Sequence, residues 1–175
     1  MTPSAADTAA IDRAAALLKI PPIWMHRIIK AESNYDPAAA NPYSSAKGLI
    51  QFTDSTARSL GYTSSAALVA ALPRIPEQTA LAVYPYLKKH APFKSQADFY
   101  LSVFNPASRS WPLFKRYSAE IQKANPGIRT PADYFFYVAR KITSPLIPLV
   151  PIAILGAILA IHFSGTRAHR GARKR

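Results

Sequence analysis

The chain has no cysteine among its 175 residues, which excludes disulfide bonds and thiolate chemistry. This absence leaves the redox compartment open. The four histidines, at positions 26, 90, 162 and 169, show no ligand-like spacing, so we expect no metal site. The first residues also lack the basic start and apolar run of a secretory signal, and they favour a helix instead.

Acidic residues are scarce as well. Nine Asp and Glu stand against 22 Lys and Arg, which gives a net charge of +13 with neutral histidines. Such an excess favours polyanionic surroundings: nucleic acid, anionic lipid or a charged cell wall. All nine acids lie before residue 143 together with 17 basic residues, so that part carries +8. The other five charges form a tail of Arg167, Arg170, Arg173, Lys174 and Arg175.

No alternating apolar pattern supports a β-sheet of any size, and we find no internal repeat. Helical patterns punctuated by proline fill the chain instead, and its length suffices for one ordinary core. A first helix over 4–19 opens with Ser4 and Asp7 in a capping-box arrangement. Further helices are predicted over 22–33, 64–72, 77–90, 93–105, 111–125 and 130–142, with Pro85 as a candidate kink. The sequence therefore predicts an all-α fold.

The helix over 22–33 carries an acid on its apolar face. Met25, Ile28, Ile29 and Glu32 fall at positions i, i+3, i+4 and i+7, and therefore share one side of the helix. A carboxylate there loses hydration, which raises its pKa and lets it donate a proton near neutral pH. The alternative is a glutamate at a fraying helix end that simply faces solvent. The helix alone favours that second interpretation.

The residues after Glu32 change this balance. A glutamate–serine pair, an aromatic, an Asp–Pro pair, a glycine–leucine–X–glutamine stretch and a threonine–alanine pair follow in a fixed order. The positions are Glu32, Ser33, Tyr35, Asp36, Pro37, Gly48, Leu49, Gln51, Thr56 and Ala57. This order resembles lytic transglycosylases of the soluble-transglycosylase (SLT) type, relatives of goose-type lysozyme. The resemblance implies a lysozyme-like, all-α catalytic domain.

A looser similarity extends to the rest of residues 8–142. Asn105 matches the asparagine of the family's alanine–tyrosine–asparagine–alanine–glycine run, with Phe104 in place of the tyrosine. Tyr137 matches the tyrosine of its final tyrosine–valine pair, and Asp54 stands where a proline is customary. Variants of this kind are similar to phage-borne wall-degrading proteins, which points to a viral source.

The resemblance implies cleavage of the β-1,4 bond between N-acetylmuramic acid and N-acetylglucosamine in a peptidoglycan glycan strand. Glu32 would act first as general acid and then as base on the muramic C6 hydroxyl, yielding a 1,6-anhydro product. The nucleophile is intramolecular, so the reaction requires no second carboxylate. It requires no cofactor and no metal either. The residues implied in substrate binding are Ser33, Gly48, Gln51, Phe104, Asn105 and Tyr137.

Several of these residues have structural alternatives. Ser33 is equally explained as a serine that caps backbone groups, and Gly48 as an ordinary turn glycine. Tyr137 is more often a core residue at its spacing, and Asp36 before a proline commonly organises a turn. Asp54 leaves the product open, because a water held there would make the enzyme a hydrolytic goose-type muramidase.

The composition changes after residue 142. No Lys, Arg, Asp or Glu occurs in the 25 residues from Ile142 to Thr166. About 20 apolar residues span a bilayer core, so we predict a catalytic domain over 1–142, a transmembrane segment over 143–164 and a basic tail over 165–175. A buried core helix or a half-inserted hairpin is the alternative. The basic tail favours the membrane, because such clusters bind anionic lipid faces.

The predicted location follows from this order. A catalytic domain before the only hydrophobic segment, with no export signal, would stay away from the cell wall. Delivery inside a virus particle resolves this, so we predict a virion protein, with other virion proteins as partners, that opens the wall of the bacterial host during genome entry. The rival is a non-enzymatic, basic, membrane-anchored scaffold that binds nucleic acid. Against it, residues 1–142 lack a dense basic helix, and we expect no specific nucleic-acid site.

Overall fold

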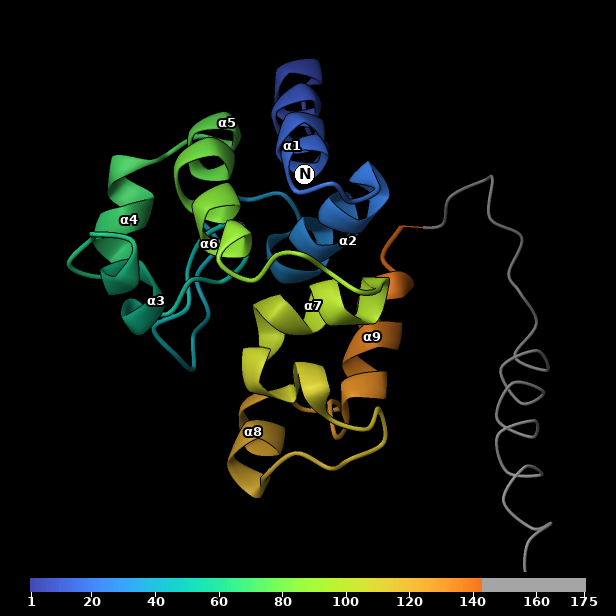
Figure 1. The fold of residues 1–175 in the computed structure, drawn as a ribbon. Helices are drawn as coiled ribbons and strands as arrows, with labels where there is room; N and C mark the ends of the chain where they lie inside the picture. The colour runs from blue at the N-terminus through green and yellow to red at the C-terminus, as the bar shows by residue number, and fades with distance from the viewer. Residues whose placement is uncertain (143–175) are drawn as a thin grey trace, which may run out of the picture. The chain divides into compact units, whose positions relative to one another are not determined.

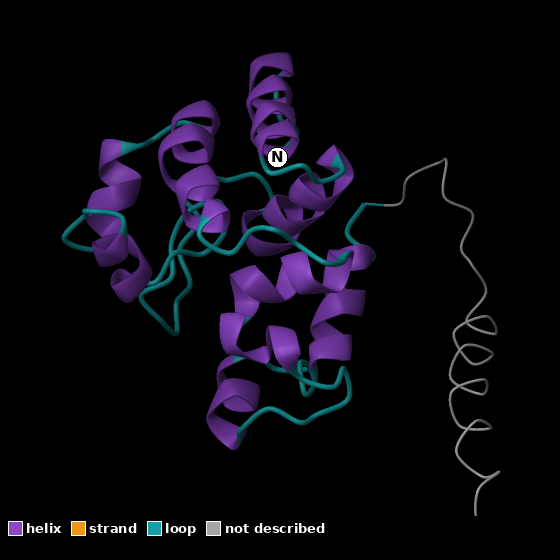
Figure 2. Ribbon diagram, viewed as in Figure 1, coloured by secondary structure: helices purple, strands orange, loops and turns teal. Residues whose placement is uncertain are grey.

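The computed structural model describes residues 1–142, in which helices joined by loops are the regular secondary structure (Figures 1 and 2). The elements, in chain order, are α1 (Ala5–Leu17), α2 (Pro22–Ser33), α3 (Asp54–Ser59), α4 (Ser65–Ala71), α5 (Ile75–Gln78), the π-helical turn η1 (Thr79–Val83), α6 (Tyr84–Lys88), α7 (Gln96–Phe104), the 3-10 turn η2 (Pro106–Ser110), α8 (Ala119–Ala124) and α9 (Pro131–Ala139). These residues contain no strand, only isolated bridges that pair Lys47 with Ala40 and with Phe52. The predicted all-α fold is confirmed for this part of the chain.

The predicted membrane segment and tail lie elsewhere in the sequence. Within residues 1–142, none of the helices combines the length and apolarity that crossing a membrane requires. The transmembrane segment predicted over 143–164 and the basic tail over 165–175 lie outside the described residues. Both therefore stay predictions.

Helix caps explain where the elements begin. Ser4 and Asp7 form the predicted capping box of α1, and Thr130 with Asp133 forms another at α9. Helix α2 begins at Pro22 and ends at Ser33, and its capping residue Asn34 adopts a left-handed φ of 53°. The next residue is left-handed as well, so the chain leaves the helix axis directly after the last turn, the turn that carries Glu32.

Two segments differ from the predicted helices. Residues 111–118 are not helical, so the helix predicted over 111–125 is wrong in its first half and only α8 forms. The reason is tertiary: Tyr117 is buried, and its backbone N–H donates to the carbonyl of Arg129 at 2.8 Å. Just before Pro85 the helix widens into η1, where the N–H of Tyr84 donates to the carbonyl of Thr79. The wider π-turn accommodates Pro85 within the helix, because proline has no N–H to donate to a preceding carbonyl.

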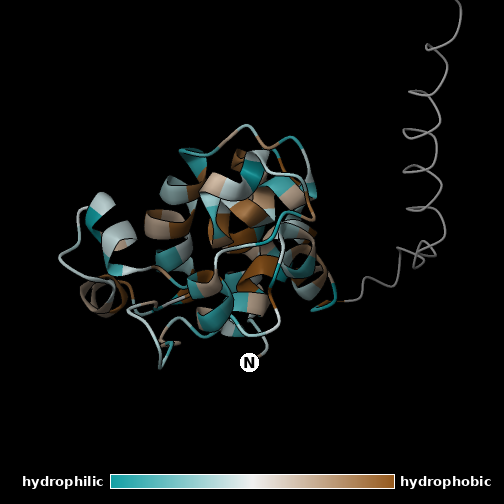
Figure 3. Cartoon of the chain, turned by 90° about the horizontal axis from the view of Figure 1, so that it is seen from below, coloured by the Kyte–Doolittle hydropathy of each residue, from teal (hydrophilic) through white to brown (hydrophobic). Residues whose placement is uncertain are grey.

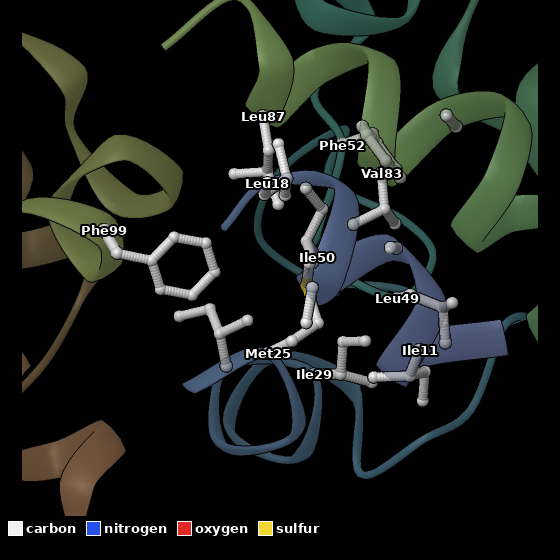
Figure 4. Close-up of a cluster of buried hydrophobic side chains, with 14 of the residues drawn as sticks. Ile11, Leu18, Met25, Ile29, Leu49, Ile50, Phe52, Val83, Leu87 and Phe99 are labelled. Atoms are coloured by element: carbon white, nitrogen blue, oxygen red, sulfur yellow. The ribbon is translucent and has the colours of Figure 1, made fainter. Parts of the chain in front are cut away.

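The apolar side of α2 forms the middle of the core. Met25, Ile28 and Ile29 are fully buried, and they pack with residues from α1, α6, α7 and the 49–52 segment (Figure 4). Helix α9 packs against α7 and also against α2, which lies far from α9 in the sequence. In Figure 3 the hydrophobic segments concentrate toward the middle of this helical body. The core thus holds the end of α2 rigidly in place.

A buried glutamine fixes the long connection after α2. Gln78 has no solvent exposure, and its Oε1 accepts from the N–H of Leu49 at 2.7 Å. Its Nε2 donates to the carbonyls of Pro37 and Leu72 at 2.8 and 3.0 Å. Gly48 passes beside it with a φ of +81°, where a Cβ would lie 2.6 Å from Oε1 of Gln78. The chemistry of one amide therefore sets the path of residues 34–53 near Glu32.

Candidate active site

Glu32 lies in the last turn of α2 and is partly buried. Burial raises the pKa of its carboxyl from 4.5 to about 7, while the Tyr134 hydroxyl and the positive charge of Lys141 oppose that rise. The shift has the direction that the apolar helix face predicts. A carboxyl with this pKa is protonated in a large fraction of molecules at neutral pH, and it can serve as a general acid.

Tyr134 holds the Glu32 carboxyl from the opposite side. Its hydroxyl donates a hydrogen bond to Oε1 of Glu32 across 102 positions of sequence. The ring is buried and stacks on Phe104, with centroids 4.3 Å apart and an interplanar angle of 21°. Burial and the neighbouring carboxylate raise the Tyr134 pKa well above its ordinary value, so the hydroxyl remains a donor. The hydrogen bond from Tyr134 therefore orients the Glu32 carboxyl, which can still gain and lose its proton near neutral pH.

Sequence reasoning missed Tyr134 as a site residue. The only signal was its place in the 130–142 helix pattern, three positions before Tyr137. A pattern within one helix cannot show which residue of another helix faces it, so the pairing with Glu32 was beyond the sequence.

A cavity of about 450 Å³ opens beside the Glu32 carboxyl. This volume lies within the range of small-ligand sites. Among the described residues that line it, Glu32 is the only acid. The lining includes Asn41, Tyr43, Ser44, Ile50, Gln51, Phe52, Thr53, Thr56, Tyr86, Val103, Phe104, Asn105, Ile121 and Asn125. Apolar walls with a few amides and hydroxyls suit a sugar, whose ring has apolar faces and a polar rim.

Three of the predicted binding residues line this cavity together with Glu32: Gln51, Phe104 and Asn105. Gln51 has a left-handed φ of 55°, and its Nε2 donates to the carbonyl of Gly48 at 3.1 Å. Asn105 ends α7 in an extended conformation, directly after the ring that stacks on Tyr134. Strained backbone beside a cavity is common at functional sites, because surrounding structure must hold it there.

The other three predicted binding residues do not line the cavity. The Ser33 hydroxyl is buried and donates to the carbonyl of Ile29 at 3.0 Å, which is the backbone-capping alternative. Tyr137 donates to the carbonyl of Ala31 at 3.1 Å and braces the backbone beside Glu32 from outside the cavity. Gly48 is required by its backbone conformation and by the close approach of Gln78. All three position the site.

Neither of the other candidate acids reaches the cavity. The Asp36 carboxylate accepts from the N–H of Ala38 at 2.8 Å and forms the predicted turn. Asp54 accepts from the N–H of Ser65 at 2.9 Å, and its Oδ1 lies 2.8 Å from the Ser65 hydroxyl, whose one proton is shared between this carboxylate and the carbonyl of Ser45. These bonds lower the pKa of Asp54. The geometry gives the Asp54 carboxylate a structural partner in Ser65.

No group of three or more His, Asp or Glu within residues 1–142 is arranged to hold a metal ion.

Comparison with known proteins agrees with this geometry. Residues 9–92 match a family model described as "Transglycosylase SLT domain". The match covers slightly less than half of the chain, from α1 to the end of α6, and includes Glu32, Gln51 and Gln78. Phe104, Asn105 and Tyr134 lie beyond it. No curated protein and no solved structure matches the chain. The matched segment is similar to domains of enzymes that act on peptidoglycan.

Proposed function

We propose that the chain is a peptidoglycan lytic transglycosylase that cleaves the β-1,4 bond between N-acetylmuramic acid and N-acetylglucosamine and forms 1,6-anhydro-N-acetylmuramic acid. One observation supports this most directly. A single carboxyl with a pKa of about 7 lies in a cavity whose described lining has no second acid, within a segment that matches the SLT domain. A reaction with one carboxyl and an internal nucleophile fits such a site.

The proposed reaction uses Glu32 twice. The protonated carboxyl gives its proton to the glycosidic oxygen, and the bond from that oxygen to the muramic C1 breaks. Positive charge on C1 then draws the C6 oxygen of the same sugar. As the C6–O–C1 bond forms, the Glu32 carboxylate takes the C6 hydroxyl proton and returns to its starting form. No water enters the products, so no second carboxylate has to activate one.

The neighbouring residues would orient the sugar. Tyr134 holds Oε1 of Glu32 and leaves the other carboxyl oxygen to face the substrate. Gln51 and Asn105 supply amides on the cavity wall, and the ring of Phe104 supplies an apolar surface between them and Tyr134. A bound strand would cover Glu32 and strengthen its interactions by excluding water.

The test is the loss of turbidity of purified peptidoglycan incubated with the full chain. Glu32→Gln should abolish clearing, because an amide cannot donate the required proton at useful rates. Glu120→Gln is the matched control: Glu120 is an exposed acid on α8 that does not line the cavity, and its variant should clear peptidoglycan at the unaltered rate. If both variants clear equally, the activity does not come from Glu32.

Mass spectrometry of the released sugars decides the product. Anhydro ends support the transglycosylase, whereas reducing ends show a hydrolytic goose-type muramidase. The complete absence of sugar release by the unaltered chain favours the non-enzymatic rival, a basic membrane-anchored scaffold that binds nucleic acid.

We further propose that the protein is carried in a virion and anchored to a membrane by residues 143–164. The uncharged sequence of that segment, the basic tail after it and the resemblance of the Phe104–Asn105–Pro106 run to phage-borne variants support this. Immunoblotting of purified particles tests it. Absence of the chain from virions would contradict the location and leave the enzymatic proposal intact.

A further inference from the structure

Tyr43 is an aromatic residue in an unusual place. It is 90% exposed, more than any other large hydrophobic residue in the described part of the chain, yet it lines the same cavity as Glu32. Leaving an aromatic ring in water forgoes the free energy that its burial would provide. An exposed ring at the rim of a candidate active site is therefore a candidate binding surface.

The loop that carries Tyr43 is closed on itself. The N–H of Asn41 donates to the carbonyl of Ala46 at 2.9 Å, which ties the two ends of the loop together. The Asn41 side chain accepts from the N–H of Tyr43 at 2.8 Å, and the Ser44 hydroxyl accepts from the N–H of Ala46 at 3.2 Å. These bonds fix the backbone on both sides of the ring.

A second set of bonds fastens the loop to the rest of the domain. The Ser65 hydroxyl donates to the carbonyl of Ser45, and the Ser45 hydroxyl accepts from the N–H of Asp54 at 3.2 Å. The Asp54 carboxylate in turn accepts from the N–H of Ser65, as described above. The acid that replaces the customary proline thus fastens the Tyr43 loop. The ring is presented from a fixed backbone.

We infer that the Tyr43 ring is a platform for one pyranose ring of the glycan strand, at a subsite away from Glu32. This inference rests on the proposed function. In a β-1,4-linked N-acetylhexosamine the ring substituents are equatorial, so the two faces of the sugar present C–H groups. An aromatic ring matches such a face, and tyrosine has few rotatable bonds to immobilise. The phenol hydroxyl remains at the edge, where water or a sugar hydroxyl can reach it.

The cavity extends from Glu32 to the end of α8, where Ile121, Ala124 and the capping residue Asn125 form part of its wall. Glu32 and Tyr43 therefore line one continuous cavity. Binding of one sugar at the Tyr43 ring would fix the position of the strand along the cavity, so that the glycosidic bond to be cleaved lies beside Glu32.

Three full-length variants test the inference. Tyr43→Ala removes the ring, and Tyr43→Phe keeps it. Phe114→Ala removes another exposed ring, 65% accessible, which does not line the cavity. On soluble peptidoglycan strands we expect Tyr43→Ala to raise KM roughly tenfold with little change in kcat. Tyr43→Phe and Phe114→Ala should retain the unaltered KM. Circular dichroism melting checks that each variant folds.

A binding measurement separates this inference from the proposed function. In a Glu32→Gln background, chitohexaose is titrated and its affinity is measured by calorimetry, with and without Tyr43→Ala. We expect roughly tenfold weaker binding without the ring. Equal affinity or equal KM with and without the ring overturns the platform. If the unaltered chain is inactive but still binds chitohexaose through Tyr43, the proposed reaction is refuted and the platform is supported. If the protein does not bind the sugar at all, the platform is overturned.

Discussion

Glu32 is held between two opposing influences. The apolar side of α2 disfavours its charge, and the Tyr134 hydroxyl with the charge of Lys141 favours it. The balance leaves the carboxyl with a pKa of about 7. Proton donation and proton acceptance by the same group are then both accessible near neutral pH, as the proposed reaction requires.

This balance costs stability at higher pH. The folded pKa of about 7 exceeds the unfolded value of 4.5, so the folded state retains a proton that the unfolded state loses. Folding stability should therefore decrease as pH rises from 4.5 to 7 and level off above. We expect the native chain to lose up to about 3 kcal/mol more than Glu32→Gln between pH 4 and pH 8. Urea unfolding of both proteins at the two pH values measures this, and parallel pH dependences would contradict it.

Tyr134→Phe should change the pH dependence of catalysis. The tyrosine hydroxyl lowers the Glu32 pKa, so its removal should raise that pKa further above 7. Glu32 must be protonated to act as an acid, and the alkaline limb of kcat/KM should therefore shift to higher pH. We also expect kcat to fall roughly tenfold, because the carboxyl loses its fixed orientation. Tyr137→Phe, which lacks only the bond to Ala31, should keep the limb in place. A limb that moves to lower pH in Tyr134→Phe would contradict the assignment.

The sequence predicted the roles of some site residues and not of others, because local patterns can be read from the sequence whereas contacts between distant helices cannot. Helical periodicity alone placed Glu32 on an apolar face, because periodicity is a local property. The pairing with Tyr134, the capping role of Ser33 and the bracing role of Tyr137 depend on which helices meet. The fixed order of motif residues indicated Gln51, and the looser similarity of the later residues indicated Phe104 and Asn105. All three line the cavity.

At the scale of elements, the long connection after α2 has a fixed path beside the site. It forms almost no regular secondary structure, yet Gln78 satisfies backbone groups at three points of it and its surroundings. An irregular segment becomes rigid when its backbone groups have buried partners.

Gln78→Leu should therefore be severely destabilising. The substitution leaves the N–H of Leu49 and two carbonyls without their buried partner, at a cost on the order of 3 kcal/mol. Leu81→Ala, at a position 59% exposed on the adjacent π-turn, is the control and should change stability little. Urea unfolding at constant pH compares them. A Gln78→Leu midpoint equal to that of the native chain would show that the amide does not fix this segment.

Element boundaries were predictable where caps occur in the sequence. Ser4, Thr130 and the prolines at 22 and 131 begin their helices as their local chemistry predicts. The helix predicted over 111–125 did not form in residues 111–118, because burial of Tyr117 outweighed local propensity. The π-turn before Pro85 could not be predicted from the sequence either. A proline within a helical pattern predicts a disturbance of the helix, but it does not predict which backbone geometry accommodates the proline.

At the scale of the whole molecule, charge dominates. A net charge of +13 creates a field that attracts an anionic cell wall before any specific contact forms. Residues 1–142 share this excess with the tail, so the attraction does not depend on the tail alone.

Binding of the inactive Glu32→Gln chain to whole peptidoglycan should therefore weaken with salt. The screening length falls from about 10 Å at 0.1 M to about 3 Å at 1 M, and we expect affinity to drop roughly tenfold across that range. Co-sedimentation with purified wall measures it. Binding of uncharged chitohexaose to the same Glu32→Gln chain is the control, and its affinity should vary little with salt. Salt-independent co-sedimentation would show that shape, and not charge, recruits the protein.

The Glu32–Tyr134 bond joins residues 102 positions apart, and this distance has a consequence for biosynthesis. A ribosome releases α2 long before it has made α9. The nascent chain therefore carries the acid without the phenol that orients it, and the pair assembles only after α9 docks. On the proposed function, polypeptides that end before α9 would lack the hydroxyl that holds the Glu32 carboxyl and should have strongly reduced activity on peptidoglycan.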